Sequence, residues 1–298
     1  MKILITGTSG FIGGKTLEIL KEQFKDDEII ALSSVETEGV RTVLHNNYNF
    51  DDNYLKENGC SDADVLIHIG AFIPKNSSDV NDIEKNNSNI LNTQKLLFSL
   101  NNLKKIIFIS TVDVYKTSIV TTENTEILPI SLYGWSKLYC EKMIEQYALS
   151  KSIIFQILRL GHVFGPGEEK YKKILPLTIN KVLNNELVEI WGDGEAIRTF
   201  IYIDDVAKAI INSIKLEASN TINIVGNEQI TINQLVESII NISNKDIKTM
   251  HISTNIPNRN LIFDNSKLKE LLLFNLVTFQ EGLAEEYKYM KEKNENIF

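Results

Sequence analysis

The segment TGTSGFIG, residues 6 to 13, decides the fold that this sequence can adopt. It follows an apolar run, KILIT at residues 2 to 6, and leads into a stretch with helical spacing at 12 to 24. Its three glycines, each three residues from the next, permit a tight turn and a close approach of the backbone to a ligand. A helix that begins at such a turn presents free N–H groups to a phosphate. A strand, this glycine loop and a helix in succession therefore predict a site for the pyrophosphate of a dinucleotide.

Further apolar runs follow along the chain, with segments of helical spacing between them. Near-continuous hydrophobic runs are typical of strands that are buried on both faces of a sheet. These runs are EIIALS (28 to 33), DVLIHIG (64 to 70), KKIIFIS (104 to 110) and IIFQILRL (153 to 160). The helical segments are 12 to 24, 79 to 100 and 134 to 150. The alternation predicts an α/β protein with a Rossmann-type, doubly wound parallel sheet.

The pattern changes after residue 165, where the loop GPGEEKYKK begins. Short strands such as VEIW and TINIV alternate there with helical segments near 172 to 184, 204 to 217, 231 to 241 and 279 to 293. We therefore expect residues 1 to 166 to form an NAD(P)-binding Rossmann domain, with 201 to 226 packing back onto it. We expect residues 167 to 298 to form a smaller, partly interleaved C-terminal lobe for the substrate.

The composition excludes several classes of partner. The 298 residues have a formal net charge of -8, with 39 acidic and 31 basic side chains, which opposes the positive field that nucleic-acid binding requires. Cys60 and Cys140 have no metal-ligand spacing, so we expect reduced thiols and no metal site. The first apolar run is too short for a signal peptide, and no run approaches the roughly 20 residues of a membrane span. We expect a cytoplasmic protein that does not bind membranes.

Tyr133 and Lys137, in SLYGWSKLYC (131 to 140), lie four residues apart. Residues at this spacing share one face of a helix, so the phenol and the ammonium group can reach the same small volume. A cation there would lower the tyrosine's pKa from its usual value of about 10 and favour proton exchange near neutral pH. Such pairs also occur by chance on many helices, so this one gains weight only from its context.

The context is a resemblance that covers nearly the whole chain. The G-x-x-G-x-x-G spacing, YGWSK as a Y-x-x-x-K motif, and FISTVDVY (108 to 115) resemble the extended branch of the short-chain dehydrogenase/reductase family, the NAD-dependent epimerases and dehydratases of nucleotide sugars. The resemblance implies hydride exchange between a nicotinamide and the sugar C4. It implies that Tyr133 exchanges a proton with the sugar oxygen, that Thr111 hydrogen-bonds the same oxygen, and that Lys137 holds the nicotinamide ribose. The alternative to a catalytic role is that the Ser110 and Thr111 hydroxyls cap a backbone group at the end of the strand.

The same resemblance implies the contacts to the cofactor. HIGAF (68 to 72) is similar to the family's second cofactor loop. Asn89 matches a structural asparagine of the family, or else it is an exposed helix residue. The expected cofactor-binding residues are Gly7, Ser9, Gly10, Phe11, Ile12, Gly13, Ser33, Ser34, Ile69, Gly70, Ala71, Ile109, Tyr133 and Lys137.

A nucleotide diphosphate-sugar substrate needs positive partners in this acidic protein. RLGHVFGPG (159 to 167) resembles the family's R-x-x-N-V-Y-G-P-G loop, with His162 in place of the usual Asn. Arg198 and Arg259 stand at the family's two arginine positions and are expected to bind the diphosphate, although either can instead form a surface ion pair. The expected substrate-binding residues are Thr111, His162, Arg198 and Arg259.

Val112 and Asp113 stand where hexose 4,6-dehydratases of this branch carry Asp and Glu. Without an acid at the first position, water elimination lacks its proton donor. A non-catalytic dinucleotide sensor on this fold would not need to keep Thr111, Tyr133 and Lys137 together. The choice therefore lies between a reductase of nucleotide-linked 4-keto-6-deoxyhexoses and a nucleotide-sugar 4-epimerase, which share these three residues.

The residues expected to contact the adenosine ribose distinguish the reductase from the epimerase in the sequence. An NAD site of this fold normally has Asp or Glu about 20 residues after the glycines. Ser33 and Ser34 stand there instead, with Arg41 nearby in sequence, and this combination tolerates a 2'-phosphate. The sequence thus favours NADP(H), with NAD(H) as the alternative, and with it the reductase.

Two segments predict the assembly. Residues 90 to 100 and 138 to 149 carry apolar residues at helical spacing, and the resemblance implies that such helices pair across a two-fold axis. We expect a homodimer through a four-helix contact. Burial against the chain's own sheet accounts for part of each apolar stripe.

Overall fold

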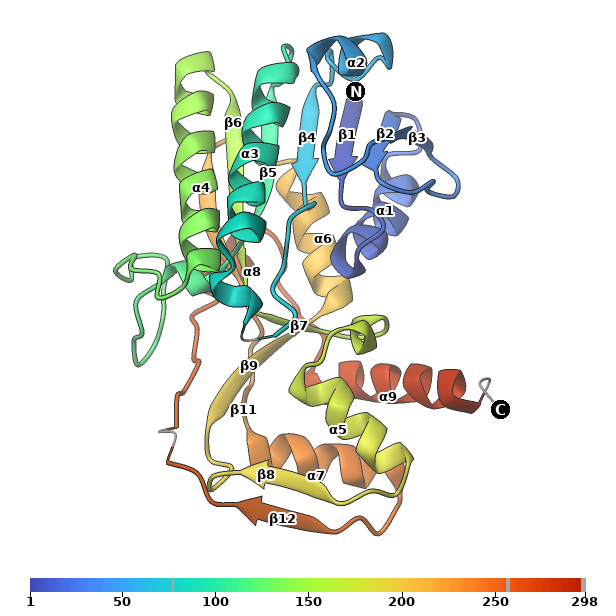
Figure 1. The fold of residues 1–298 in the computed structure, drawn as a ribbon, viewed down its shortest axis with the longest axis vertical. Helices are drawn as coiled ribbons and strands as arrows, with labels where there is room; N and C mark the ends of the chain where they lie inside the picture. Colours follow the sequence, from blue (N-terminus) through green and yellow to red (C-terminus); the bar gives the residue numbers. More distant parts are fainter. Residues whose placement is uncertain (77, 256–257, 296–298) are drawn as a thin grey trace.

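A parallel sheet of seven strands forms the upper part of the molecule (Figure 1). The computed structural model describes residues 1–76, 78–255 and 258–295. The strand order is β3-β2-β1-β4-β5-β6-β10, so the direction of winding reverses between β1 and β4. The strands are β1 (Lys2–Thr6), β2 (Glu28–Ser33), β3 (Arg41–Leu44), β4 (Val65–His68), β5 (Lys105–Thr111), β6 (Ile154–Leu160) and β10 (Asn220–Ile224). This topology confirms the predicted doubly wound sheet.

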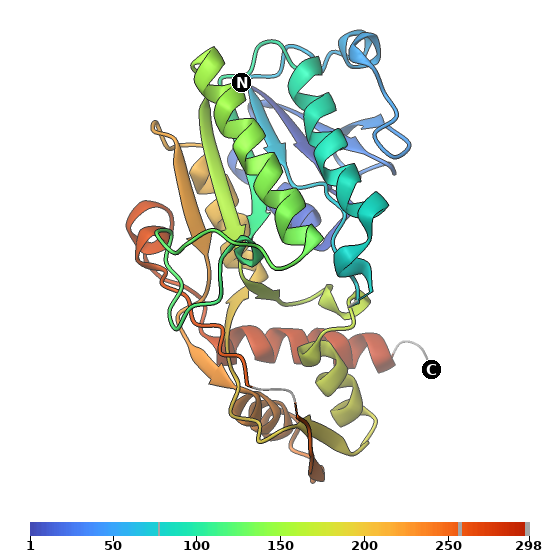
Figure 2. The same ribbon diagram turned by 60° about the vertical axis from the view of Figure 1, so that its left-hand side comes forward.

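Helices cover both faces of this sheet because alternate side chains of each strand point to opposite sides. Ile3 and Ile5 of β1 pack in one apolar cluster with α1 and α6, whereas Leu4 packs in a second cluster with α3 and α4. Helices α3 and α4 lie side by side in both ribbon views (Figures 1 and 2). The helices of this part are α1 (Phe11–Gln23), α2 (Asp52–Glu57), α3 (Ile83–Ser99), α4 (Leu132–Lys151) and α6 (Ile203–Ser213).

Beyond β6 the chain leaves the large sheet and builds a smaller lobe below it (Figure 2). This lobe has a three-stranded sheet of order β11-β9-β7 and a two-stranded sheet of β12 and β8, against which α5, α7 and α9 pack. Its elements are β7 (His162–Phe164), α5 (Ile174–Leu183), β8 (Val188–Trp191), β9 (Ile197–Tyr202), β11 (Gln229–Thr231), α7 (Ile232–Ser243), β12 (Thr249–Ile252) and α9 (Phe279–Glu295). Between β9 and β11 the chain returns to the upper part, where α6 packs on α1 and β10 pairs with β6.

Short elements complete the chain and join the two lobes. They are the 3-10 turns η1 (Asp79–Asn81), η2 (Val112–Val114) and η3 (Glu168–Lys170), and the helix α8 (Ser266–Leu271). After η2, the loop before α4 contacts the extended segment before α8: Thr121 N donates to Ile262 O at 2.9 Å, and Asp264 N donates to Thr121 O at 2.9 Å. Within the described ranges, no helix combines the length and the apolar character needed to cross a lipid bilayer.

A buried carboxyl group on α9 makes the stability of the fold depend on pH. Glu286 is 1% exposed, and burial together with the charge of Glu168 raises its pKa to about 9. The folded protein therefore keeps a proton that the unfolded chain releases above the ordinary pKa of a glutamate. The stabilisation from this group is fully present below about pH 4.3 and is lost as the pH rises toward 9.

We expect Glu286→Gln to remove this pH dependence, because the amide resembles the protonated acid and cannot ionise. The melting temperature of the variant should exceed that of the wild type by a margin that grows between pH 6 and pH 9. The limiting slope for one proton is about 1.4 kcal/mol per pH unit. Glu285→Gln, at the exposed neighbouring position, is the matched control. Parallel melting curves for wild type and Glu286→Gln across this pH range would contradict the assignment.

Candidate active site

The glycine loop is held in a conformation that other residues cannot adopt. It begins where β1 ends, and Gly7 has a left-handed φ of 77°. A Cβ atom on Gly13 would lie 2.0 Å from Gly7 O, and one on Gly7 would lie 2.6 Å from Gly70 N. Helix α1 begins after Gly10 with no side chain capping its first N–H groups. These groups are directed as a phosphate site of this kind requires.

A cavity of about 560 Å³ extends from this loop to the second lobe. It lies at the carboxyl ends of β1, β2, β4 and β5, next to the position where the sheet reverses its winding, which is where open parallel sheets bind ligands. All fourteen residues expected to contact the cofactor line it: Gly7, Ser9, Gly10, Phe11, Ile12, Gly13, Ser33, Ser34, Ile69, Gly70, Ala71, Ile109, Tyr133 and Lys137. The described residues contain no cluster of three or more His, Cys, Asp or Glu side chains that could bind a metal ion.

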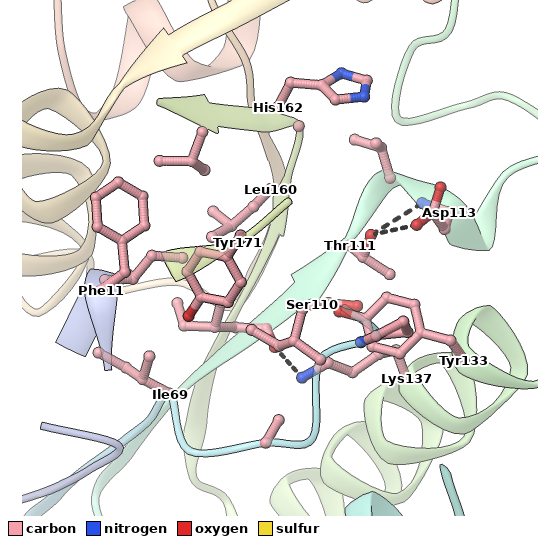
Figure 3. A pocket seen from close by; sticks show the side chains of 18 of the residues that line it. Phe11, Ile69, Ser110, Thr111, Asp113, Tyr133, Lys137, Leu160, His162 and Tyr171 are labelled. Carbon is pink, nitrogen blue, oxygen red and sulfur yellow. Dashed lines mark hydrogen bonds between the residues drawn. The ribbon is translucent and has the colours of Figure 1, made fainter. Parts of the chain in front are cut away.

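The three residues expected to be catalytic lie together on one wall of the cavity (Figure 3). Thr111 ends β5, and Tyr133 and Lys137 extend toward it from the first turns of α4. The helix can start so close to β5 because its first turn contains Gly134, where a Cβ atom would lie 2.6 Å from Asp113 O. Ser131 caps the helix by accepting a hydrogen bond from Gly134 N at 3.1 Å.

The electrostatics of this wall differ from the expectation drawn from sequence. Burial and the negative charge of Asp113 raise the pKa of Tyr133, and a hydrogen bond with Thr111 only partly opposes the rise. Lys137 does not lower it: its Nζ donates to Ile109 O at 2.7 Å and lies 4.7 Å from the centre of the Phe108 ring. Burial lowers the pKa of Lys137 itself to about 8. The prediction that the ammonium group lowers the tyrosine's pKa is therefore wrong.

The loop that follows β4 is fixed by neutral hydrogen bonds. His68 is buried, and its ring nitrogens lie 2.9 Å from Thr6 Oγ1 and 3.1 Å from Thr93 Oγ1. Burial lowers the pKa of His68 to about 3, so the imidazole is neutral. Asn89 is also buried, and its amide exchanges two hydrogen bonds with the backbone of Phe72, at 2.7 and 3.2 Å. Asn89 therefore holds the cofactor loop and is not an exposed helix residue.

Of the four residues expected to bind substrate, Thr111 lies on the catalytic wall. His162 and Arg259 line the cavity, whereas Arg198 does not. Arg198 Nη1 donates to the backbone oxygens of Arg259 at 2.6 Å and Ile197 at 2.8 Å, so its guanidinium supports the segment that carries Arg259. Burial and the charges of Lys173, Arg198 and Arg259 lower the pKa of His162 to about 4. The sequence reasoning missed Lys173, which lines the cavity at the N-cap of α5.

Ser33 and Ser34 line the cavity at the end of β2, but Arg41 does not reach them. Arg41 begins β3 and pairs in register with Ile30, three residues below the end of β2. Its guanidinium donates to Glu28 Oε1 at 3.2 Å and to Asn58 O at 2.7 Å. The expectation that Arg41 assists a 2'-phosphate is therefore wrong.

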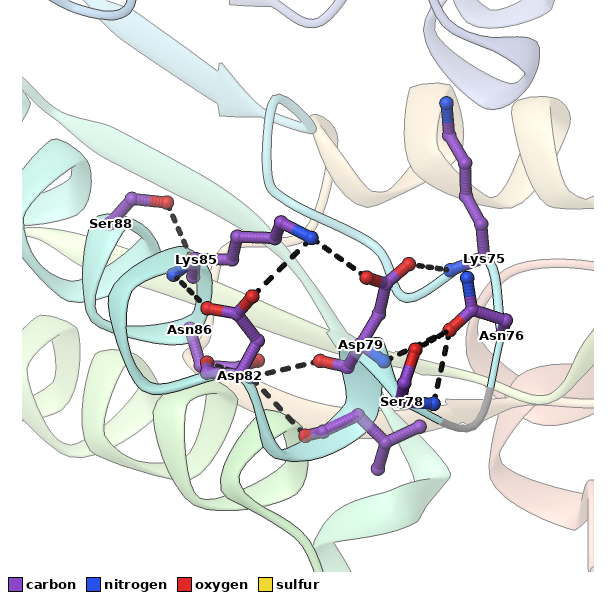
Figure 4. A network of polar contacts seen from close by, with 9 residues as sticks. Lys75, Asn76, Ser78, Asp79, Asp82, Lys85, Asn86 and Ser88 are labelled. Carbon is purple, nitrogen blue, oxygen red and sulfur yellow. Dashed lines mark hydrogen bonds and ion pairs between the residues drawn. The ribbon is translucent and has the colours of Figure 1, made fainter.

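Sequence reasoning also missed the wall formed before α3. Ile73, Pro74, Lys75 and Val80 line the cavity, and a polar network holds their loop in place (Figure 4). In this network Asp79 accepts from Lys75 N at 3.2 Å and from Lys85 Nζ at 2.7 Å. The run of short polar residues NSSDVND predicts turns and a helix N-cap at this place, yet it gives no sign that the turns face a cavity.

Asp113 is a further cavity residue beside the catalytic wall. Its Oδ2 accepts a hydrogen bond from Thr111 Oγ1 at 3.3 Å, and its backbone N–H donates back to the same hydroxyl at 3.2 Å (Figure 3). Burial raises the pKa of Asp113. The carboxyl group thus orients the Thr111 hydroxyl and adds negative charge close to Tyr133.

Known proteins share this architecture. A profile of the NAD dependent epimerase/dehydratase family matches residues 3–225. The chain is 31% identical, over 97% of its length and 98% of the relative, to an uncharacterised UDP-glucose epimerase, YtcB, of Bacillus subtilis (strain 168). It is 32% identical, over 81% of its length, to a dTDP-D-glucose 4,6-dehydratase of Dictyostelium discoideum, of which it spans 62%.

Solved structures agree with these relatives. The crystal structure of a UDP-glucuronic acid 4-epimerase from Bacillus cereus in complex with NAD matches with a TM-score of 0.84 at 27% identity, over 98% of this chain and 99% of that chain. Family profile, relatives and fold point to the same group of enzymes. The chain belongs to the NAD dependent epimerase/dehydratase family, within the extended short-chain dehydrogenases/reductases.

Proposed function

We propose that this chain is an NAD-dependent nucleotide-sugar 4-epimerase. The observation that carries the proposal is the convergence of Thr111, Tyr133 and Lys137 on a cavity that reaches both the glycine loop and the cations of the second lobe. A diphosphate bound by Lys173 and Arg259 would extend its sugar toward the catalytic wall, next to the dinucleotide site. In this proposal, residues 1 to 166, together with 201 to 226, bind the dinucleotide. Residues 167 to 298 bind the nucleotide sugar.

The roles proposed for the three residues are those that the family resemblance implies, and their common position on the cavity wall supports them. When bound, a nicotinamide supplies a carbon that takes up a hydride and returns it. Tyr133 exchanges a proton with the sugar's C4 oxygen, and Thr111 hydrogen-bonds the same oxygen. Tyr133 must accept the proton of the C4 hydroxyl as the hydride leaves and return it to the ketone oxygen as the hydride comes back, and its raised pKa favours the neutral phenol that the return step needs. Lys137, held by the Ile109 carbonyl, is placed to bind the ribose hydroxyls.

Two observations favour the epimerase over the reductase of 4-keto-6-deoxyhexoses. The expectation of NADP(H) rests on the Ser33 and Ser34 hydroxyls with Arg41 as an assisting cation, but Arg41 instead binds Glu28 and Asn58 three residues below the end of β2. His45, whose backbone N donates to Ser33 O at 2.9 Å, also lines the cavity, and burial lowers its pKa, so its neutral imidazole offers no charge to a 2'-phosphate. A relative named as a UDP-glucose epimerase and an NAD-bound 4-epimerase structure also support retained NAD. A 4,6-dehydratase is disfavoured by Val112, which replaces the expected acid.

The cofactor assignment is tested by denaturing the purified protein and identifying the nucleotides that it releases. We expect NAD or NADH in near-stoichiometric amount, since an epimerase must keep its cofactor through oxidation and re-reduction. Release of NADP, together with NADPH consumption on addition of a nucleotide-linked 4-ketosugar, would restore the reductase. Release of NAD without turnover of any nucleotide sugar would instead indicate a dinucleotide sensor.

We further propose that the chain forms a homodimer through α3 and α4. Six large apolar side chains on these two adjacent helices are at least 48% exposed: Ile83, Leu91, Phe98, Trp135, Tyr139 and Leu149. Four helices meeting across a two-fold axis would bury them.

Sedimentation tests this assembly. The wild type should be a dimer at micromolar concentration, and Phe98→Glu combined with Leu149→Glu should give monomers, because the interface would then bury four unpaired carboxylates. Phe274→Glu is the control, since Phe274 is 84% exposed and lies outside these helices. A monomeric wild type would reject the dimer.

A further inference from the structure

A buried polar cluster lies directly behind the catalytic wall. Its centre is Glu141 of α4, which is completely buried and accepts hydrogen bonds from Arg159 Nε at 3.0 Å and Nη2 at 2.6 Å. Ser110 Oγ donates to the same carboxylate at 2.5 Å. Arg159 Nη1 also donates to the Tyr115 hydroxyl at 2.8 Å, and that hydroxyl donates to Asn223 Oδ1 at 2.7 Å.

The cluster joins one helix to three strands. Ser110, Arg159 and Asn223 are direct neighbours in the register of β5, β6 and β10, so they form a row across the sheet. Glu141 reaches this row from α4. Burying an ion pair costs desolvation that an apolar pair of the same volume would avoid, so stability alone does not account for it. What the pair adds is a fixed position of α4 relative to the end of β5.

That position matters because the same two elements carry the catalytic residues. Lys137 precedes Glu141 by one helical turn, and both are attached to consecutive residues of β5: Lys137 to the Ile109 carbonyl and Glu141 to the Ser110 hydroxyl. The next residue of the strand is Thr111. A rotation or slide of α4 would therefore break the cluster and displace Lys137 from β5 in the same movement.

We propose that Glu141 and Arg159 are positioning residues for the C4 chemistry, and that Glu141 also supplies a fixed negative charge one turn from Lys137. The inference rests on the proposed function for its effect on turnover. Its effect on Lys137 is independent of the sugar, because it concerns the charge and place of that lysine alone.

The surroundings of Lys137 show why this charge matters. Burial lowers the lysine's pKa to about 8, and the charges of Cys140 and Glu141 oppose that fall. The titratable group that faces Lys137 from β4 is His68, which is neutral, and β5 contributes the Phe108 ring and the Ile109 carbonyl. Cys140 is a neutral thiol at physiological pH, since burial raises its pKa. Glu141, held in its ion pair with Arg159, is thus the carboxyl group of the cluster whose charge opposes the effect of burial on Lys137.

The test measures NADH affinity of the full chain, after its retained dinucleotide has been removed, by fluorescence titration between pH 6 and pH 10. In the wild type, affinity should fall as Lys137 loses its proton. Glu141→Gln keeps the shape and one acceptor oxygen but removes the charge, so the midpoint of this fall should move down by about one pH unit or more. The kcat of Glu141→Gln should fall about tenfold or more with little change in KM. The sugar would still bind, but Lys137 and the other catalytic groups would be displaced from it.

Two further variants separate positioning from mere stability. Glu141→Met combined with Arg159→Met replaces the pair with apolar side chains of similar length, which such cores accept without loss of stability. We expect this variant to fold, to show a midpoint below that of the wild type by less than in Glu141→Gln, because the Arg159 charge is removed as well, and to have a lowered kcat. Asp205→Asn is the remote control: Asp205 is 2% exposed and accepts from Val277 N at 2.7 Å, so its loss should lower the melting temperature and leave the midpoint unchanged.

The outcomes are distinct. Wild-type midpoint and kcat in the folded Met/Met variant would overturn the proposal and leave the cluster a purely structural one. A shifted midpoint in both Glu141 variants supports it even if no nucleotide sugar is turned over. In that case the proposed function fails while the positioning of Lys137 stands.

Discussion

Replacing Tyr133 with phenylalanine is expected to lower turnover by at least about 100-fold, the effect of removing a general acid-base group. The change deletes only the phenolic oxygen, so the ring still fills its place beside Thr111 and Asp113. Melting temperature and dinucleotide content should therefore match those of the wild type. The measurement is kcat with a nucleotide sugar, normalised to the dinucleotide that each preparation contains.

A second phenol in the same cavity provides the control for this variant. Tyr171 also lines the cavity, but it lies on the loop before α5 and its phenol hydrogen-bonds the backbone of Phe11. Tyr171→Phe should change turnover far less than Tyr133→Phe. Near-normal turnover of Tyr133→Phe, or an equal loss in both variants, would remove Tyr133 from the chemistry.

Gly13→Ala is expected to abolish tight dinucleotide binding, because its methyl group would lie 2.0 Å from Gly7 O. The loop must shift to relieve this contact, and overpacking of this kind costs about 1–3 kcal/mol or more. Where this cost arises in the dinucleotide-bound conformation of the loop, dinucleotide affinity should drop roughly ten- to hundredfold. The measurement is NADH affinity by fluorescence titration, with the melting temperature recorded in parallel.

The next residue offers a matched control. A Cβ atom on Gly14 would have Thr8 O as its nearest neighbour, at 3.4 Å, and no strained backbone angle. Gly14→Ala should keep dinucleotide affinity, and it should raise the melting temperature because alanine favours a helix by about 1 kcal/mol over glycine. Equal affinities for Gly13→Ala and Gly14→Ala would show that the loop does not hold a phosphate in the way described.

The residues that sequence reasoning placed correctly are those whose constraint is local. The glycine loop is specified by backbone geometry over seven residues, and the buried strands by continuous apolar runs. Thr111, Tyr133 and Lys137 came together because strand ends and helix starts of a doubly wound sheet meet at one edge. These arguments need only the order of strands and helices along the chain.

The errors concern distances that spacing does not determine. The i, i+4 spacing predicts that Lys137 shares a face of α4 with Tyr133. The hydrogen bond of Lys137 to Ile109 and its burial depend on how α4 packs on β5. Arg41 is close to Ser33 in sequence, yet parallel strands require the chain to turn back before the next strand begins. Arg41 therefore starts β3 three residues below the end of β2. Lys173 and the loop before α3 were missed because surface turns and cavity walls have the same composition.

The central claim is that the chain inverts C4 of a nucleotide sugar with a cofactor that it keeps. The most direct measurement uses the protein as purified, without added dinucleotide, and UDP-glucose or UDP-N-acetylglucosamine that carries deuterium at C4. We expect NMR to show the C4 epimer with the deuterium retained at C4, because the hydride leaves and returns within one site while Tyr133 handles only the proton on oxygen. The claim is contradicted if no C4 epimer forms from either sugar while NADPH is consumed with a nucleotide-linked 4-ketosugar, or if the epimer that forms has lost its label to water.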